Sequence, residues 1–194
     1  MNSILRKSIL GIAGLTVAGG LAAGPLNHDS APTARDAAVT TQAAGTRDTA
    51  TLIPHGVQGN QSHIDLTDEQ TANVKAIIAA TKKAGMDERA AVVSIATALQ
   101  ESKLENLGHL GDRNDHDSQG LFQQRPSSGW GTVEQITDPE YSTTAFLKGL
   151  KQVDGWRDMP LTVAAQTVQV SAYPDHYAQW EQQAADLVAQ HWNK

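Results

Sequence analysis

The sequence has 194 residues, a formal net charge of −6 at pH 7 and no cysteine. This length fits one domain with or without tails, and it can bury a sizeable core without cross-links. The absence of cysteine excludes disulfides, thiol nucleophiles and thiolate metal sites. Because the chain is acidic and has no basic cluster, we expect no nucleic-acid partner.

The N-terminus has the pattern of a secretory signal peptide. Arg6 and Lys7 precede an apolar run over residues 9–23, and this run ends in small residues suited to cleavage. We expect a signal peptide over residues 1–24. The run is shorter than the roughly twenty residues that span a bilayer, so we expect no stable membrane insertion after cleavage. An uncleaved anchor is the alternative.

Residues 25–63 are mainly Ala, Thr, Gly, Asn, Gln and Pro, with almost no large apolar side chain. Such a composition cannot offset the conformational entropy that is lost on ordering. We therefore expect a disordered linker over residues 25–63 and one folded domain over residues 64–194.

Two helical patterns open this domain. Thr67 and Gln70 have the spacing of a capping box, and the amphipathic segment that follows stops at Gly85. Asp87 caps a second helix, which has large apolar residues on one side and Ala, Ser and Thr on the other. This second pattern is typical of a helix buried in the middle of a domain.

Glu101 stands near the end of the second predicted helix, where the helix dipole disfavours negative charge. It follows Leu99 by two residues, about 200° around the helix, so it faces away from the strongest apolar stripe. There it would emerge among small side chains, where a ligand could come close. A carboxyl among apolar groups has a raised pKa, as an acid needs for protonating a leaving oxygen near neutral pH. An ordinary surface glutamate is the alternative.

Residues 103–119 have the Gly and Asp content of a loop, and the following segment 120–124 predicts one or two helical turns before Pro126. Trp130 lies on a glycine-flanked loop and is the best candidate for stacking on a sugar. The loop also holds possible metal ligands, but calcium-loop and zinc patterns are absent, so we expect no metal and no other cofactor. The possible metal ligands in this loop are His109, Asp112, Asp115, His116 and Asp117.

Three more helices are predicted towards the C-terminus. Asp138 and Pro139 open a helix to Val153, and a small-residue helix runs over residues 162–172. Asp175 caps a last helix that carries Tyr177 and Trp180, for which we expect structural roles. No convincing hairpin is present, so the predicted fold is mainly α.

Three short segments carry a pattern across this domain. They are Glu101-Ser102, Gly120-Leu121-Phe122-Gln123 with a proline soon after, and Ala172-Tyr173. In this order they resemble the soluble lytic transglycosylase domain of the lysozyme-like superfamily, which has E-S, then G-L-M-Q and a proline, then A-Y-N-A-G-P. The resemblance covers residues 64–194 in helix order and is closest to small exported transglycosylase-type proteins of actinomycetes.

The resemblance implies a role for each matching residue. Glu101 matches the catalytic acid, Tyr173 matches the tyrosine that lies near this acid, and Ser102 is implied to contact substrate. Phe122 replaces the family's methionine, and Pro174-Asp175 replaces asparagine and alanine. The segment implied to line the cleft floor consists of Gly120, Leu121, Phe122 and Gln123.

The resemblance further implies a lysozyme-like fold that cuts peptidoglycan glycan strands between N-acetylmuramic acid and N-acetylglucosamine. The predicted signal peptide indicates a secreted or cell-wall-associated protein, and we expect a monomer. Glu101 would act as general acid and then as base, and the product would be a 1,6-anhydro sugar. A hydrolytic muramidase is an alternative that needs a second acid, for which Asp112, Asp115 and Asp117 are the near candidates. A non-catalytic cell-wall glycan-binding module and a structural or regulatory exported protein also remain open.

Overall fold

The computed structural model describes residues 49–111, 116–171 and 173–194. In these ranges the chain is helical and has no strand, only an isolated bridge between Gln119 and Gln124. The predicted mainly α fold is thereby confirmed, whereas the predicted signal peptide lies outside the described residues. No helix in these ranges is both long and apolar enough to cross a membrane. The α-helices are α1 (Asp68–Lys83), α2 (Glu88–Ser102), α3 (Val133–Ile136), α4 (Pro139–Leu150), α5 (Leu161–Gln169) and α6 (Glu181–His191).

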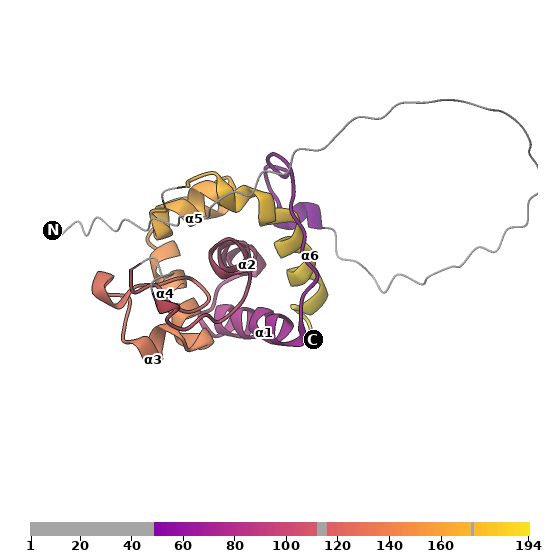
Figure 1. Ribbon diagram of the computed structural model, residues 1–194. Coiled ribbons are helices and arrows are strands. Elements are labelled where there is room, and N and C mark those ends of the chain that lie inside the picture. The colour runs from indigo at the N-terminus through magenta and orange to yellow at the C-terminus, as the bar shows by residue number, and fades with distance from the viewer. Residues whose placement is uncertain (1–48, 112–115, 172) are drawn as a thin grey trace, which may run out of the picture. The chain divides into compact units, whose positions relative to one another are not determined.

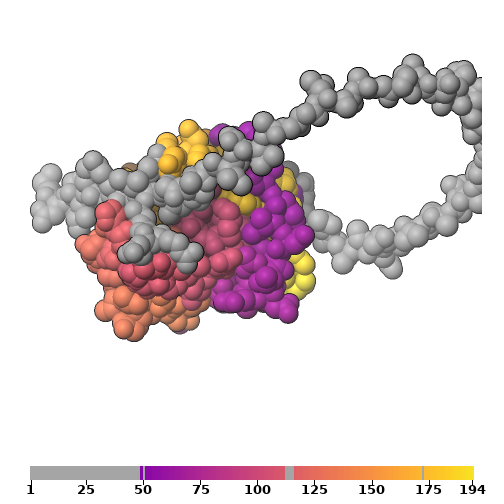
Figure 2. Space-filling model, viewed as in Figure 1, coloured from indigo at the N-terminus to yellow at the C-terminus, as the bar shows by residue number. Residues whose placement is uncertain are grey.

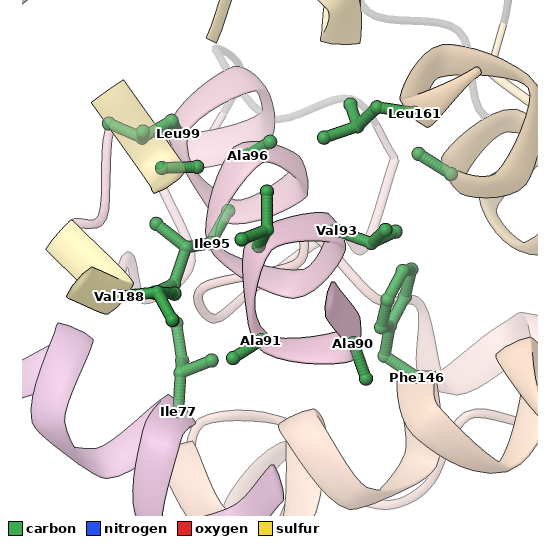
Figure 3. Close-up of a cluster of buried hydrophobic side chains, with 14 of the residues drawn as sticks. Ile77, Ala90, Ala91, Val93, Ile95, Ala96, Leu99, Phe146, Leu161 and Val188 are labelled. Atoms are coloured by element: carbon green, nitrogen blue, oxygen red, sulfur yellow. The ribbon is translucent and has the colours of Figure 1, made fainter. Parts of the chain in front are cut away.

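Helix α2 is the centre of the domain, and α1, α4, α5 and α6 surround it (Figure 1). Almost every residue of α2 is buried, as expected from its pattern. Figure 3 shows Ile77, Phe146 and Val188 approaching α2 from three neighbouring helices. Short side chains such as Ala91 and Ala96 on α2 leave room for this close approach. The end of α2 therefore lies where several elements meet.

The predicted helix starts are confirmed by their caps. Thr67 and Gln70 form both bonds of the capping box, with the Thr67 backbone N–H 2.8 Å from Oε1 of Gln70. Asp87 accepts the backbone N–H of Ala90 at 3.1 Å, and Asp138 caps α4. These side chains satisfy backbone donors that have no partner within the helix.

Several predicted helix boundaries are wrong. Residues 119–124 form a tight turn closed by the Gln119–Gln124 bridge, with positive φ at Gly120 and Gln123, so they are not helical turns. α5 ends at Gln169 because Val170 adopts a left-handed conformation with φ 53° and ψ 47°. Tyr173 therefore lies beyond that helix, and Ala172 is outside the described residues.

Other boundaries differ less. α4 ends at Leu150 rather than at Val153. The last predicted helix is divided into the 3-10 helix η5 (His176–Trp180) and α6. Short elements that the pattern did not predict are α3 and the 3-10 helices η1 (Thr49–Leu52), η3 (Pro126–Ser128) and η4 (Trp156–Asp158).

Residues 49–63, which we expected within the disordered linker, are packed on the domain (Figure 2). Leu52 and Ile53 are buried in its core. The Ser62 backbone N–H donates to the Gln179 carbonyl at 2.7 Å, and Gln61 donates to the Ala178 carbonyl at 3.0 Å. The folded domain therefore begins before residue 64, because two apolar side chains and a set of polar contacts anchor this segment.

A buried ion pair joins α2 to α6. Nη1 of Arg89 lies 2.7 Å from Oε1 of Glu181, and both side chains are less than a tenth exposed. The same guanidinium donates to the carbonyl of Leu52 at 2.8 Å. Arg89 thus ties the N-terminal segment and the last helix to the central helix.

Candidate functional site

Glu101 lies at the C-terminal end of α2 and is only 9% exposed. Its Oε1 accepts a hydrogen bond from the Tyr177 hydroxyl at 2.6 Å. Nε2 of Gln169 makes a longer contact with the same oxygen at 3.4 Å. The three residues come from α2, η5 and the end of α5. Glu101 is therefore a buried carboxyl at the junction of three elements, and the ordinary surface glutamate considered above is wrong.

The turn over residues 119–124 is bonded directly to this junction. The Ser102 hydroxyl donates to the Leu121 carbonyl at 2.8 Å and also contacts the Ala98 carbonyl at 3.1 Å. Nε2 of Gln169 donates to the Phe122 carbonyl at 2.9 Å. Gln169 thus connects the turn with Glu101, and Ser102 is used to hold the turn on α2.

The side chains of Leu121 and Phe122 belong to the core. Both are essentially unexposed, and the Phe122 ring stacks on the Phe146 ring with centroids 5.1 Å apart. They therefore anchor the turn. In this segment the backbone and the side chain of Gln123 are the groups that could contact a ligand. Gln123 is half-buried, and its amide donates to the Gly120 carbonyl.

Gly120 is required by the close approach of another chain segment. Its φ is +77°, and a Cβ at this position would lie 2.0 Å from the backbone oxygen of Ile136. Its own N–H donates to the Leu107 carbonyl at 2.7 Å. The glycine that begins the G-L-F-Q segment thus has a steric role at the base of the turn.

Tyr177, and not Tyr173, holds the position beside Glu101. Tyr177 is completely buried. Burial, the charge of Glu101 and the hydrogen bond to Glu101 raise the pKa of Tyr177 far above its ordinary value of 10, so its hydroxyl remains a donor at neutral pH. Tyr173 is 40% exposed and stacks on His176, with ring centroids 4.8 Å apart. Tyr177 of η5 is thus the tyrosine that is bonded to Glu101, and a substrate contact of Tyr173 stays a prediction.

Lys103 adds a cation near Glu101. It caps α2 in a left-handed conformation, and its Nζ lies 4.5 Å from the centroid of the Trp180 ring. Burial lowers the pKa of Lys103, and the charge of Glu101 acts in the opposite direction. A nearby cation favours the charged form of a carboxyl, so Lys103 opposes the effect of burial on Glu101.

The pattern could not identify Gln169, Tyr177 or Lys103 as neighbours of Glu101, because they meet only through the packing of α2 against α5 and η5. One signal was available for Tyr177. A tyrosine in an apolar helical pattern needs a partner for its hydroxyl when it is buried.

Trp130 lies on the loop between η3 and α3 and is packed partly against the core. It borders a groove of about 480 Å³ next to α4 and α5. Glu101 is not among the residues that line this groove. The groove is lined by Gly129, Trp130, Tyr141, Thr144, Ala145, Lys148, Gly149, Thr167, Val168 and Val170.

Asp117 braces the loop that follows α2. Its carboxylate accepts from Nε of Arg125 at 2.9 Å and from the backbone N–H of Ser127 at 2.8 Å. Burial raises the pKa of Asp117, but the bonds from Ser127 and Arg125 outweigh it and lower this pKa to about 2. Asp117 is therefore an ionised brace. Asp112 and Asp115 lie outside the described residues, and within the described ranges no three acidic or histidine side chains are grouped to hold a metal.

Comparison with known proteins gives no family for this chain. No family model matches it, and no curated protein is significantly similar to it. What the site can do therefore follows from its own chemistry. A carboxyl that is buried, oriented by a phenol donor and close to a cation has the geometry of a proton donor or acceptor.

Proposed function

We propose that this chain is an exported peptidoglycan glycosidase, a lytic transglycosylase in which Glu101 is the general acid and base. One observation carries the proposal. Glu101 is a buried carboxyl, bonded to Tyr177 at 2.6 Å, at a helix end that also holds a tight turn. Burial favours the protonated form of a carboxyl, which is the form that can protonate a leaving oxygen.

In the proposed reaction, Glu101 gives its proton to the glycosidic oxygen between N-acetylmuramic acid and N-acetylglucosamine, and the bond from C1 to this oxygen breaks. The acetamido group of the substrate stabilises the sugar cation. The Glu101 carboxylate then takes the proton of the 6-hydroxyl, whose oxygen bonds to C1. The product is a 1,6-anhydro sugar, no water is consumed, and Glu101 is protonated again.

The surroundings of Glu101 suit both steps. Tyr177 and Gln169 fix the orientation of the carboxyl, so that one oxygen is held and the side chain loses little freedom during reaction. Lys103 stabilises the carboxylate that forms after the first proton transfer.

The state of Asp117 removes one of the three candidates for the second acid of a hydrolase. A hydrolytic muramidase on this scaffold needs a second carboxyl that acts on water or on the sugar. The Asp117 oxygens are engaged by Arg125 and Ser127 and are held in the charged form. The transglycosylase route needs Glu101 alone.

A non-catalytic glycan-binding module is the second candidate. Glu101 is only 9% exposed, and Pro174-Asp175 departs from the asparagine and alanine of the family that the sequence resembles. Both features reduce the room and the polar contacts for substrate at this carboxyl. The binding module would still be exported, monomeric and directed to the same glycan strands.

The experiment that separates these candidates is product analysis. The full chain is incubated with purified peptidoglycan, and the released fragments are weighed by mass spectrometry. The proposal predicts fragments with anhydromuramic ends, lighter by one water than hydrolytic fragments. Fragments with hydrated ends would show that the protein is a hydrolytic muramidase and not a lyase. Glycan that binds the protein but stays intact would replace both by the binding module.

A further inference from the structure

We propose that the groove between Trp130 and α4 binds a carboxylate-bearing unit of a glycan strand. The proposal rests on the proposed function for its substrate, but its observations are independent of Glu101. The groove measures about 480 Å³ and combines two aromatic side chains, two threonine hydroxyls and one lysine, with no carboxylate among the described residues that line it. Small-molecule sites typically have this mixture of apolar walls and a few polar groups.

The loop that carries Trp130 packs closely against Tyr141 at Gly131. Gly131 has φ +143°, and a Cβ there would lie 2.9 Å from the ring and the hydroxyl oxygen of Tyr141. A side chain at position 131 would have to displace the Tyr141 ring, so glycine suits the close packing of the Trp130 loop on Tyr141. Tyr141 remains 36% exposed. Fixed, partly exposed aromatic faces suit the apolar faces of sugar rings, and the hydroxyls of Thr144 and Thr167 suit sugar hydroxyls.

Lys148 gives the groove its charge preference. It is exposed on α4, and within the described ranges its side chain makes no ion pair or hydrogen bond. Lys151, in contrast, donates to the Ala84 carbonyl at 2.8 Å and does not line the groove. A lysine beside aromatic and hydroxyl groups, with no carboxylate among the described lining residues, attracts an anionic saccharide more strongly than a neutral one.

The groove and the Glu101 site share the end of α5. Val168 and Val170 line the groove, and Gln169 between them bonds to the Phe122 carbonyl and contacts Glu101. Each valine Cα is about 3.8 Å from that of Gln169. Val170 is a β-branched residue in a left-handed conformation, which is strained and needs support from its surroundings. The groove and the Glu101 site therefore meet at the same three residues of the chain, Val168 to Val170.

The carboxylate has two sources in a peptidoglycan strand, the lactyl group of muramic acid and the peptide stem. The test uses the full chain with Glu101→Gln, which prevents turnover, and isothermal titration with three oligosaccharide probes. The first probe is neutral β-1,4-linked N-acetylglucosamine tetramer. The second alternates N-acetylglucosamine with muramic acid and has free lactyl carboxylates. The third has peptide stems on the muramic acid.

At low salt we expect an acidic probe to bind roughly two- to fivefold more tightly than the neutral one, which is the range that one exposed ion pair provides. The preference should fall with added salt. Lys148→Gln should remove it, whereas Lys148→Arg and the control Lys151→Gln should keep it. Preference for the second probe assigns the lactyl group, and preference for the third assigns the stem.

Equal affinity for neutral and acidic probes, no binding of any probe, or a preference that survives Lys148→Gln would each overturn the proposal. Cleavage of peptidoglycan by the protein with its native Glu101, with and without Lys148→Gln, distinguishes failure of the groove proposal from failure of the proposed function. If the glycan is cut while Lys148 has no effect, the groove proposal alone is wrong. If the Lys148-dependent preference is found and nothing is cut, the groove site stands and the catalytic proposal is wrong.

Discussion

The hydrogen bond from Tyr177 to Glu101 gives a direct prediction for stability. Tyr177→Phe removes a 2.6 Å bond between a fully buried phenol and a carboxyl that is 9% exposed. Removing one partner of a buried hydrogen bond leaves the other group unsatisfied, at a cost of about 1–3 kcal/mol. We therefore expect the free energy of unfolding to fall by about 2 kcal/mol. For a domain of this size, that lowers Tm by about 4–8 °C.

The same bond predicts a loss of stability in alkali. The folded pKa of Tyr177 is raised above its unfolded value of about 10. The contribution of Tyr177 to the free energy of unfolding is complete below pH 10. It is lost as the pH rises above 10, because the tyrosine of the unfolded chain releases its proton first. Tyr177→Phe should lose less stability than the wild type between pH 9 and pH 11.

The assay is urea unfolding followed by circular dichroism, with Tyr173→Phe as the matched control. Tyr173 is 40% exposed, so its hydroxyl should contribute within about 0.5 kcal/mol. Equal effects of the two substitutions at pH 7 would refute the reasoning. If Tyr177→Phe loses as much stability as the wild type between pH 9 and pH 11, the reasoning is refuted as well.

Three further predictions concern the scaffold. Gly120→Ala should destabilise the domain by at least about 3 kcal/mol in urea unfolding, since the new Cβ would lie 2.0 Å from the Ile136 oxygen. Arg89→Met should cost about 3–5 kcal/mol in the same assay, because it leaves the buried Glu181 carboxylate without its partner. Asp117→Asn should flatten the loss of thermal stability on acidification. Burial raises the Asp117 pKa, but its bonds lower it to about 2, so its contribution is present above pH 3.8 and is lost towards pH 2.

Each of these has its own control. Gly85→Ala tests the cost of positive φ alone, because no atom lies within 4 Å of a Cβ there, and a loss as large as that of Gly120→Ala would contradict the steric argument. Adding Glu181→Met to Arg89→Met should recover stability, and no recovery would contradict the role of the unpaired charge. If the Tm of Asp117→Asn falls as steeply as that of the wild type from pH 5 to pH 2, the proposed role of ionised Asp117 in stabilising the loop is contradicted.

Local patterns predicted much of the fold. The caps at Thr67, Asp87 and Asp138 were predictable, because a capping side chain and its partner lie within three residues of each other. The central position of α2 was also predictable, since its sequence is apolar on one side and small on the other. Such features depend on neighbours in the sequence.

Features that depend on distant neighbours could not be predicted. The end of α5 at Val170 requires a left-handed β-branched residue, which local preference disfavours. The segment at 49–63 is anchored by Leu52 and Ile53, the two large apolar residues of the segment that are buried. For the candidate site, the pattern singled out Glu101 but assigned the neighbouring tyrosine to Tyr173.

The account depends most on Glu101 as the proton donor. The most direct measurement is the rate at which the full chain releases fragments from purified peptidoglycan, for the wild type and for Glu101→Gln, with both shown to be folded by circular dichroism. Loss of a general acid and base that acts in both proton transfers should reduce the rate by at least about a thousandfold. Release by Glu101→Gln at a rate within tenfold of the wild type would contradict the account.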